Sequence, residues 1–449
     1  MSVHKENIKV KRNDKRLLWR IHHWAGLYAG ILIGVLSLTG ALAVFIPEID
    51  ALILKHRYHA NSSPSTVVYP QIGNSIDSLR RWFPTYTSLS VRLPQQVSDI
   101  AEVDLIVVPD GGKLQRYDFF VDAGADRIIG QRNHQNSLAN YLRQIHVRLY
   151  EGNWGRQLVG FGGVALIVLA VTGLMIYGNF MKRQSWPDVR KKVGMRILMA
   201  DWHKLLGISA LAFNLVIAVT GAWLGLQPWL MRAFDIKTPN AYKATVIMEP
   251  EVDKALQVDW GEVFATVEKE FPELRPSDIA LSGNGSATIS VRGNIAGLVY
   301  ERNINTLVLS KTGYIPQFKY DVRQQPFSHK LYFVQEALHF GDFGGLLLKI
   351  IYAILGLVSG FLSVSGFVIY LYRQKKKRAE INAMKLTFIY SMASILFLVM
   401  IALISIYIGY SQAATVAAFL INGIIIGLPV YALVRYAMGR IRNRSIQTA

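Results

Sequence analysis

The sequence has 449 residues, of which 51% are hydrophobic, and it carries a formal net charge of +19 at pH 7. The absence of cysteine excludes thiolate metal ligands, iron–sulfur clusters and disulfide bonds. The basic residues gather beside long apolar runs, which favours a membrane protein over a nucleic-acid-binding protein.

Six apolar runs each reach the roughly 20 residues that a helix needs to cross a bilayer. They lie at 24–46, 157–179, 205–227, 346–371, 386–410 and 413–434. We therefore expect an α-helical integral membrane protein with six spans.

Four segments rich in Lys and Arg set the predicted topology. They are the N-terminal tail 1–23, the loops 180–204 and 372–385, and the C-terminal tail 435–449. Short basic segments remain in the cytoplasm. Both termini are therefore expected there, and the stretches 47–156 and 228–345 are expected outside the membrane.

The first span follows His22 and carries Gly26, Gly30 and Gly34 at intervals of four residues. This spacing puts all four residues on one stripe of a helix. Such a stripe either packs closely against another membrane helix or leaves a flat channel beside the histidine for a planar cofactor. The third span repeats only the first step, with Gly207 at the position of Gly26.

The two external stretches each predict a small α+β module. A helix over Ser75–Phe83 ends at Pro84 in the first, and a helix over Trp260–Phe271 ends at Pro272 in the second. Alternating segments separated by turn residues follow both helices. The expected strands are near Leu105–Val108, Tyr117–Val121 and Arg127–Ile129, and near Ala287–Val291, Leu298–Arg302 and Thr306–Leu309.

The chain contains an internal repeat that includes four histidines. The matched pairs are His22 and His203, Thr39-Gly40 and Thr220-Gly221, His146 and His339, and Thr172-Gly173 and Ser365-Gly366. Because both halves run in the same direction, the repeat predicts a four-helix core built by parallel duplication. The spans 386–410 and 413–434 fall outside it and are expected to form an extra C-terminal helical hairpin.

The four repeated histidines are the candidate cofactor ligands. A span of 23 residues is about 35 Å long at ~1.5 Å per residue, so histidines at its two ends cannot bind one metal together. We expect His22 to pair with His203 near the cytoplasmic face, and His146 to pair with His339 near the external face. His23 points about 100° away from its neighbour on a helix and is interpreted as structural.

Two imidazoles alone do not suit structural zinc, which is almost always four-coordinate. Haem iron needs only two axial ligands from the protein, and histidine is a standard one. Because no C-x-x-C-H motif is present, the pattern favours haem b, with two haems in all. Gly26, Gly30 and Gly207 are expected to provide close packing beside the haem, and no catalytic residue is identified.

The segment His22-His23-Trp24-Ala25-Gly26-Leu27, its copy from His203, and the segment that begins His339-Phe340-Gly341 resemble the PepSY-associated transmembrane-helix family. The resemblance covers about residues 16–373. That family includes iron-regulated inner-membrane proteins and haem-containing siderophore reductases. The extra terminal hairpin departs from its four-span core.

The resemblance implies PepSY-like periplasmic modules, a bacterial inner membrane, and haem ligands at His22, His146, His203 and His339. It also implies electron transfer from a cytoplasmic or quinol donor to a ferric-siderophore or another periplasmic acceptor, with lipid but no nucleic acid as a partner. The favoured function is thus a ferric or siderophore reductase. Two alternatives stay open: a non-enzymatic PepSY protein that binds peptide or restrains a peptidase, and a histidine-lined metal-uptake component.

Overall fold

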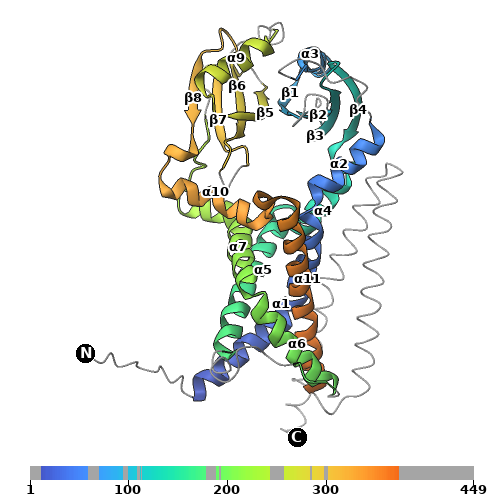
Figure 1. The fold of residues 1–449 in the computed structure, drawn as a ribbon, viewed down its shortest axis with the longest axis vertical. Helices are drawn as coiled ribbons and strands as arrows, with labels where there is room; N and C mark the ends of the chain where they lie inside the picture. The colour runs from blue at the N-terminus through green and yellow to red at the C-terminus, as the bar shows by residue number, and fades with distance from the viewer. Residues whose placement is uncertain are drawn as a thin grey trace, which may run out of the picture. The chain divides into compact units, whose positions relative to one another are not determined.

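The computed structural model describes residues 12–58, 70–94, 100–108, 112, 114–177, 189–191, 194–242, 257–283, 286–297 and 302–373. The predicted spans 386–410 and 413–434, the C-terminal tail and most of the loop 372–385 lie outside these residues. Figure 1 shows the elements in chain order. The chain divides into two compact units, one built from residues 1–45, 142–230 and 344–449, and one from 46–141 and 231–343.

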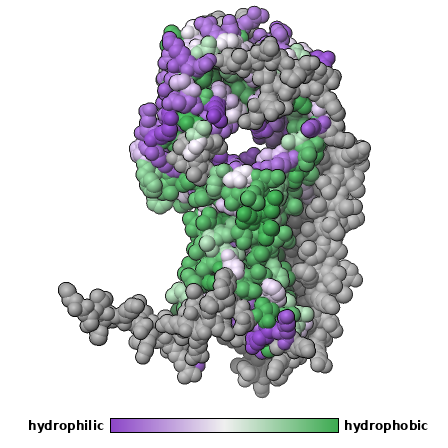
Figure 2. Space-filling model, viewed as in Figure 1, coloured by the Kyte–Doolittle hydropathy of each residue, from purple (hydrophilic) through white to green (hydrophobic). Residues whose placement is uncertain are grey.

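The first unit is helical. Its helices are α1 (Arg12–Ala43), α5 (Gly152–Tyr177), α6 (Met195–Ser209), α7 (Leu211–Ala233, which ends in the second unit) and α11 (Gly345–Arg373). Among the described residues, four helical segments are long and apolar enough to cross a membrane: Arg16–Ala43, Gly152–Tyr177, Leu211–Ala233 and Asp342–Tyr370. The visible surface of these helices is mainly hydrophobic (Figure 2).

The helices of this unit pack against one another in pairs, and small residues lie at a close contact between two of them. Helix α1 packs against both α5 and α11, and α6 packs against α11. Helices α5 and α7 approach closely at Gly160 and Gly225, where a methyl group on Gly225 would lie 2.4 Å from the Gly160 Cα. Glycines allow this approach because they place no side chain between the helix backbones.

Helix α7 contains Pro228, which cannot donate a hydrogen bond to the carbonyl of Leu224. Arg156 of α5 takes over this role. Its Nε and Nη2 atoms donate to the Leu224 oxygen at 3.0 and 2.8 Å, and Nη2 also donates to Gln227 Oε1 at 3.0 Å. A proline in a membrane helix is tolerated when a neighbouring group satisfies the freed carbonyl in this way.

The second unit contains one antiparallel sheet of eight strands in the order β4-β3-β2-β1-β5-β6-β7-β8. The strands are β1 (Tyr86–Arg92), β2 (Ile100–Val107), β3 (Gln115–Asp122), β4 (Arg127–Asn133), β5 (Arg275–Ser282), β6 (Thr288–Asn294), β7 (Asn305–Ser310) and β8 (Pro316–Tyr320). The sequence predicts two modules, and the structure joins their strands through the β1–β5 pair. The expected strand Leu298–Arg302 lies almost wholly outside the described residues.

Shorter helices flank these strands. Helices α2 (Ile46–Arg57) and α3 (Gly73–Trp82) precede β1, α9 (Trp260–Glu270) precedes β5, α4 (Leu138–Arg148) follows β4 and α10 (Phe327–Phe340) follows β8. Short 3-10 turns lie at His134–Asn136, Val322–Gln324 and Asp342–Gly344. Strand β4 is tied to α2 because Arg132 donates to both carboxylate oxygens of Asp50, at 2.7 and 2.8 Å.

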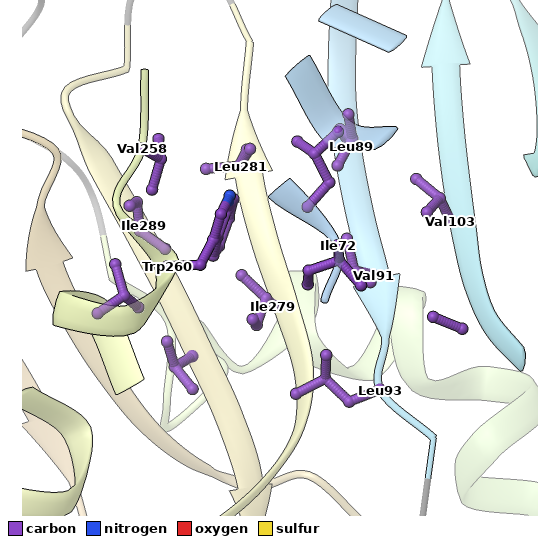
Figure 3. Packing of buried hydrophobic residues seen from close by; sticks show 14 of the residues in the cluster. Ile72, Leu89, Val91, Leu93, Val103, Val258, Trp260, Ile279, Leu281 and Ile289 are labelled. Atoms are coloured by element: carbon purple, nitrogen blue, oxygen red, sulfur yellow. The ribbon is translucent and has the colours of Figure 1, made fainter. Parts of the chain in front are cut away.

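A single hydrophobic core crosses the joint between β1 and β5. Leu89 and Val91 lie opposite Leu281 and Ile279, and all four side chains are fully buried or nearly so. Trp260 of α9 belongs to the same cluster and lies 3.1 Å from where a methyl group on Gly73 of α3 would stand. Figure 3 shows side chains from both halves of the unit meeting in this core.

The other face of the joint is charged. Glu102, Arg92, Asp278 and Arg292 stand in one cross-strand row on β2, β1, β5 and β6, with alternating signs. Arg92 donates to Glu102 at 2.5 Å, and Arg292 pairs with Asp278. Opposite charges at facing positions stabilise strand pairing, so this row favours the observed register.

We predict that replacing Arg156 with Met destabilises the helical unit by about 1.5–3 kcal/mol, the usual range for hydrogen bonds to a charged group. The reason is that the Leu224 carbonyl loses its donor. The free energy of unfolding in mixed detergent micelles checks this. In a Pro228→Ala background, where the backbone N–H at position 228 returns, the same replacement is expected to cost less. Equal costs in the two backgrounds would contradict this role of Arg156.

Candidate functional site

The rings of the two inner histidines lie next to each other, edge to face, within the helical unit. His22 comes from α1 and His203 from α6, and their ring centroids are 6.4 Å apart with an interplanar angle of 88°. Both side chains are partly buried. The structure therefore brings together the pair that the repeat predicts at the cytoplasmic end of the spans.

Each inner histidine is held by a hydroxyl group from a different helix. His22 Nδ1 lies 3.0 Å from Thr172 Oγ1 of α5. His203 Nδ1 lies 2.9 Å from Ser365 Oγ of α11. Because Nδ1 is engaged in both rings, Nε2 on the far side of each ring is the nitrogen left to contact a ligand.

A glycine follows each hydroxyl residue and makes room for the ring. A methyl group on Gly173 would lie 3.2 Å from His22 Cε1, and one on Gly366 would lie 3.5 Å from His203 Cε1. The dipeptides Thr172-Gly173 and Ser365-Gly366 thus act as ring seats, in which the hydroxyl contacts Nδ1 and the glycine leaves space for Cε1.

His146 has the same kind of ring seat, built from α1. Its Nδ1 atom lies 3.1 Å from Thr39 Oγ1, and a methyl group on Gly40 would lie 2.9 Å from its Cε1. His146 is on α4, which leads through Leu149 and Tyr150, both with positive φ, into α5 at Gly152. His146 is therefore on a short helix that turns through these residues into the second apolar helix.

The spacing of seventeen residues between His22 and Thr39 now has a structural explanation. At ~1.5 Å per residue the two positions are about 25 Å apart along α1. Helix α1 therefore supplies a histidine at one end and a ring seat for another histidine at the other. The segment from α4 to α5 has the same two features. It supplies His146 at its start and, further along, the ring seat Thr172-Gly173 for His22.

His339 lies on α10 in the sheet unit, whereas His146 lies in the helical unit. Its ring packs edge-on against Phe340, with centroids 5.6 Å apart. Phe340 in turn lies under the guanidinium of Arg302 at 4.1 Å, and Arg302 also pairs with Asp342. The pairing of His146 with His339 stays a prediction.

Of the three glycines expected beside the cofactor, Gly30 adjoins open space, and Gly26 and Gly207 have only ordinary contacts. Gly30 is buried, yet a methyl group there would meet no atom within 4 Å beyond the local helix backbone. At Gly26 the nearest atom would be Leu169 Cδ2 at 3.6 Å, and at Gly207 it would be Leu362 Cδ2 at 3.8 Å. A helix-packing stripe would show closer contacts, as the pair Gly160 and Gly225 does.

Burial keeps the histidines outside the spans neutral. It lowers the pKa of His203 to about 4, with a smaller contribution from nearby His22. It also lowers the pKa of His146 to about 4. Both imidazoles are therefore uncharged at neutral pH, which is the form that binds metals.

The carboxylate of Asp201, two residues before His203 on α6, is balanced by basic partners. Asp201 is buried, and it accepts hydrogen bonds from Arg190 Nε and Nη2, each at 2.9 Å. Lys204 Nζ lies 3.0 Å from the same carboxylate. These bonds, chiefly those from Arg190, hold the pKa of Asp201 well below its usual range.

Other histidines have local partners. His23 packs against Tyr370 of α11 with ring centroids 5.0 Å apart, and His134 Nδ1 lies 2.9 Å from Asp118 Oδ1 in the sheet unit. Within the described part of the chain, no group of three or more His, Asp or Glu side chains has the arrangement of a metal site.

In the sequence, Thr39, Thr172 and Ser365 are recognisable only as markers of the repeat, and their contacts with the histidines are not evident. The signal is present in the sequence, because a hydroxyl residue followed by glycine recurs together with each histidine. Recognising it requires the pairing of α1 with α5 and of α6 with α11.

A model of the family described as the PepSY-associated TM region matches residues 19–373. The chain belongs to this family. The family inferred from the sequence is thus confirmed, and the protein is a membrane protein with an antiparallel sheet domain. One similar protein is PA4219 of Pseudomonas aeruginosa, itself uncharacterised, which is 34% identical over 88 residues. That alignment covers 19% of this PepSY family member and 21% of the relative.

We predict a graded response when methyl groups are added to the ring seats. Gly40→Ala is expected to be the most destabilising, by about 1–3 kcal/mol as for other overpacked sites, because its methyl group would lie 2.9 Å from His146. Gly173→Ala follows, and Gly366→Ala is close to neutral because 3.5 Å is an ordinary contact. Unfolding in one detergent checks the order, with Gly30→Ala as the control. A uniform cost across the series would contradict the ring-seat geometry.

Proposed function

We propose that this PepSY family member is a b-type haem protein that transfers electrons across the bacterial inner membrane. The observation that carries this proposal is the His22–His203 pair. Its rings lie edge to face at a centroid distance of 6.4 Å, and the Nδ1 atom of each ring is engaged elsewhere.

The inner pair fits a haem better than a bare metal ion. Two imidazoles bound through Nε2 to opposite sides of one metal have ring centroids roughly 6 Å apart, taking ~2.1 Å for each metal–nitrogen bond. The observed separation agrees with this value. The buried open space at Gly30 supports a planar group beside the histidines. Among the described residues, no group of three or more His, Asp or Glu side chains is arranged to hold a bare ion.

Each part of the chain has a defined task in this proposal. His22 and His203 would hold the inner haem, and His146 with His339 the outer one. Haem supplies reversible one-electron chemistry when it is bound. Thr172 and Ser365 orient the inner rings, and the surrounding apolar helices exclude water from the site.

The proposal includes finer features of the architecture. It places six spans in the membrane, with both termini in the cytoplasm and the eight-stranded sheet in the periplasm. It also treats the two halves as a parallel duplication. The order of elements supports this, because a helix, four strands, a 3-10 turn, a helix and a long apolar helix occur in both halves. The spans 386–410 and 413–434 form the extra hairpin.

The acceptor we propose is ferric iron or a ferric siderophore in the periplasm, and the donor is a quinol or a cytoplasmic reductant. Family membership supports a membrane role, and the length of the spans separates the two ends of the electron path. Reduction to Fe(II) would weaken the hold of a hard-oxygen chelator and release iron for import.

We predict that the purified protein contains two haems b per chain, seen as an absorption band that shifts on addition of dithionite. His22→Ala and His203→Ala are each expected to lose the same one of the two haems, and the double variant to lose no more. His146→Ala is expected to lose the other haem. His23→Ala, adjacent to His22 on α1, serves as the control and retains both.

Two results would count against the proposal. A colourless protein from haem-replete cells would reject the haem and favour the peptide-binding or metal-uptake functions. Loss of different haems in His22→Ala and His203→Ala would reject the inner pairing but not the presence of haem. Assays in membrane vesicles with ferric chelates then identify the acceptor.

A further inference from the structure

The hydroxyl group of each ring seat gives its only proton to its own helix. Thr172 Oγ1 donates to the Val168 carbonyl at 2.5 Å, and Thr39 Oγ1 donates to the Val35 carbonyl at 2.8 Å. Ser365 Oγ donates to the Leu362 carbonyl at 3.1 Å. A hydroxyl has one hydrogen to donate and two lone pairs that accept. Towards the histidine, each of these oxygens is therefore an acceptor.

A backbone carbonyl lies beside each of the same imidazoles. The carbonyl three residues before the hydroxyl residue forms a hydrogen bond with each ring: Leu169 with His22, Leu36 with His146 and Leu362 with His203. A carbonyl can only accept a hydrogen bond. Each ring thus has both a hydroxyl and a backbone carbonyl as acceptors.

We propose that these acceptors fix the tautomer of His22, His146 and His203, with the proton on Nδ1 and the lone pair on Nε2. The opposite tautomer would place the Nδ1 lone pair against the lone pairs of the hydroxyl oxygen, which is repulsive. The hydrogen positions are assigned from this arrangement of acceptors. Thr172, Thr39 and Ser365 are then positioning residues, because they act through the imidazoles.

This inference deepens the proposed function, because Nε2 is the atom that would bind iron. A hydrogen bond from the second ring nitrogen fixes the orientation of a ligating histidine and raises its basicity. The two halves carry Thr172 and Ser365 at matched positions. Thr and Ser share a hydroxyl group, but only Thr has a methyl group. The hydroxyl oxygen is therefore the part of the side chain that the ring seat uses.

The first test uses protein without haem. Solid-state nitrogen NMR of the full chain in lipid, with 15N-labelled histidine, distinguishes the two neutral tautomers. Signals are assigned by their loss in His22→Gln, His146→Gln and His203→Gln. We expect protonated Nδ1 in all three residues. Protonated Nε2 in any of them would overturn the assignment for that ring seat.

The second test uses the haem-loaded protein and two sets of variants, which either remove the hydroxyl group or exchange Thr and Ser between the matched positions. Thr172→Val keeps the shape of the side chain and removes the oxygen. Thr172→Ser introduces the residue type found at the matched position, Ser365. Ser365→Ala and Ser365→Thr form the matching set. We expect the Val and Ala variants to raise the reduction potential of the inner haem, because a less basic ligand favours Fe(III) less, and to bind haem roughly 10-fold more weakly. The Ser and Thr variants are expected to behave like the wild-type protein.

The two tests separate this inference from the proposed function. If the protein binds no haem but the NMR signals show protonated Nδ1, the tautomer assignment stands and the haem proposal fails. If haem is bound while the Val and Ser variants at position 172 have the same potential and the same affinity, the positioning role fails and the haem proposal stands.

Discussion

The hydrogen bond between an imidazole and a hydroxyl on a neighbouring helix is the interaction on which the candidate site depends. It occurs between α1 and α5 at His22, between α6 and α11 at His203, and between α4 and α1 at His146. In an apolar environment each ring needs a polar partner, because an unsatisfied buried polar group is costly. The helix pairs and the orientation of the histidines are therefore specified by the same contacts.

Much of the candidate site can be predicted from the sequence, and the reason is repetition. His22 and His203 are recognisable because their surroundings recur, and the structure places their rings together. The role of Thr172 cannot be predicted in the same way. It depends on the register in which α1 and α5 pack, and that register follows from side-chain shape along both helices. His339 belongs to the sheet unit, so its partner is likewise not determined by spacing.

The helices and several strands of the sheet unit are predictable, but the joint between β1 and β5 is not. Strand β1 alternates serines with leucine and valine, which gives a weak apolar signal. Strand β5 contains Pro276, a residue that argues against a strand in the middle of a sheet. The structure accommodates it near the start of the strand, where the pairing with β6 shifts register. Long-range pairing of this kind leaves no local trace in the sequence.

The joint also limits how the chain can be divided. Strands β1 and β5 are each other's neighbours in the centre of the sheet, so either four-stranded half on its own would carry a long unpaired edge and an open hydrophobic face. Exposed edges of this kind promote association with other strands. A polypeptide that carried only one half would satisfy its edge strand by pairing with a second copy of itself. The covalent link between the halves makes that self-association unnecessary.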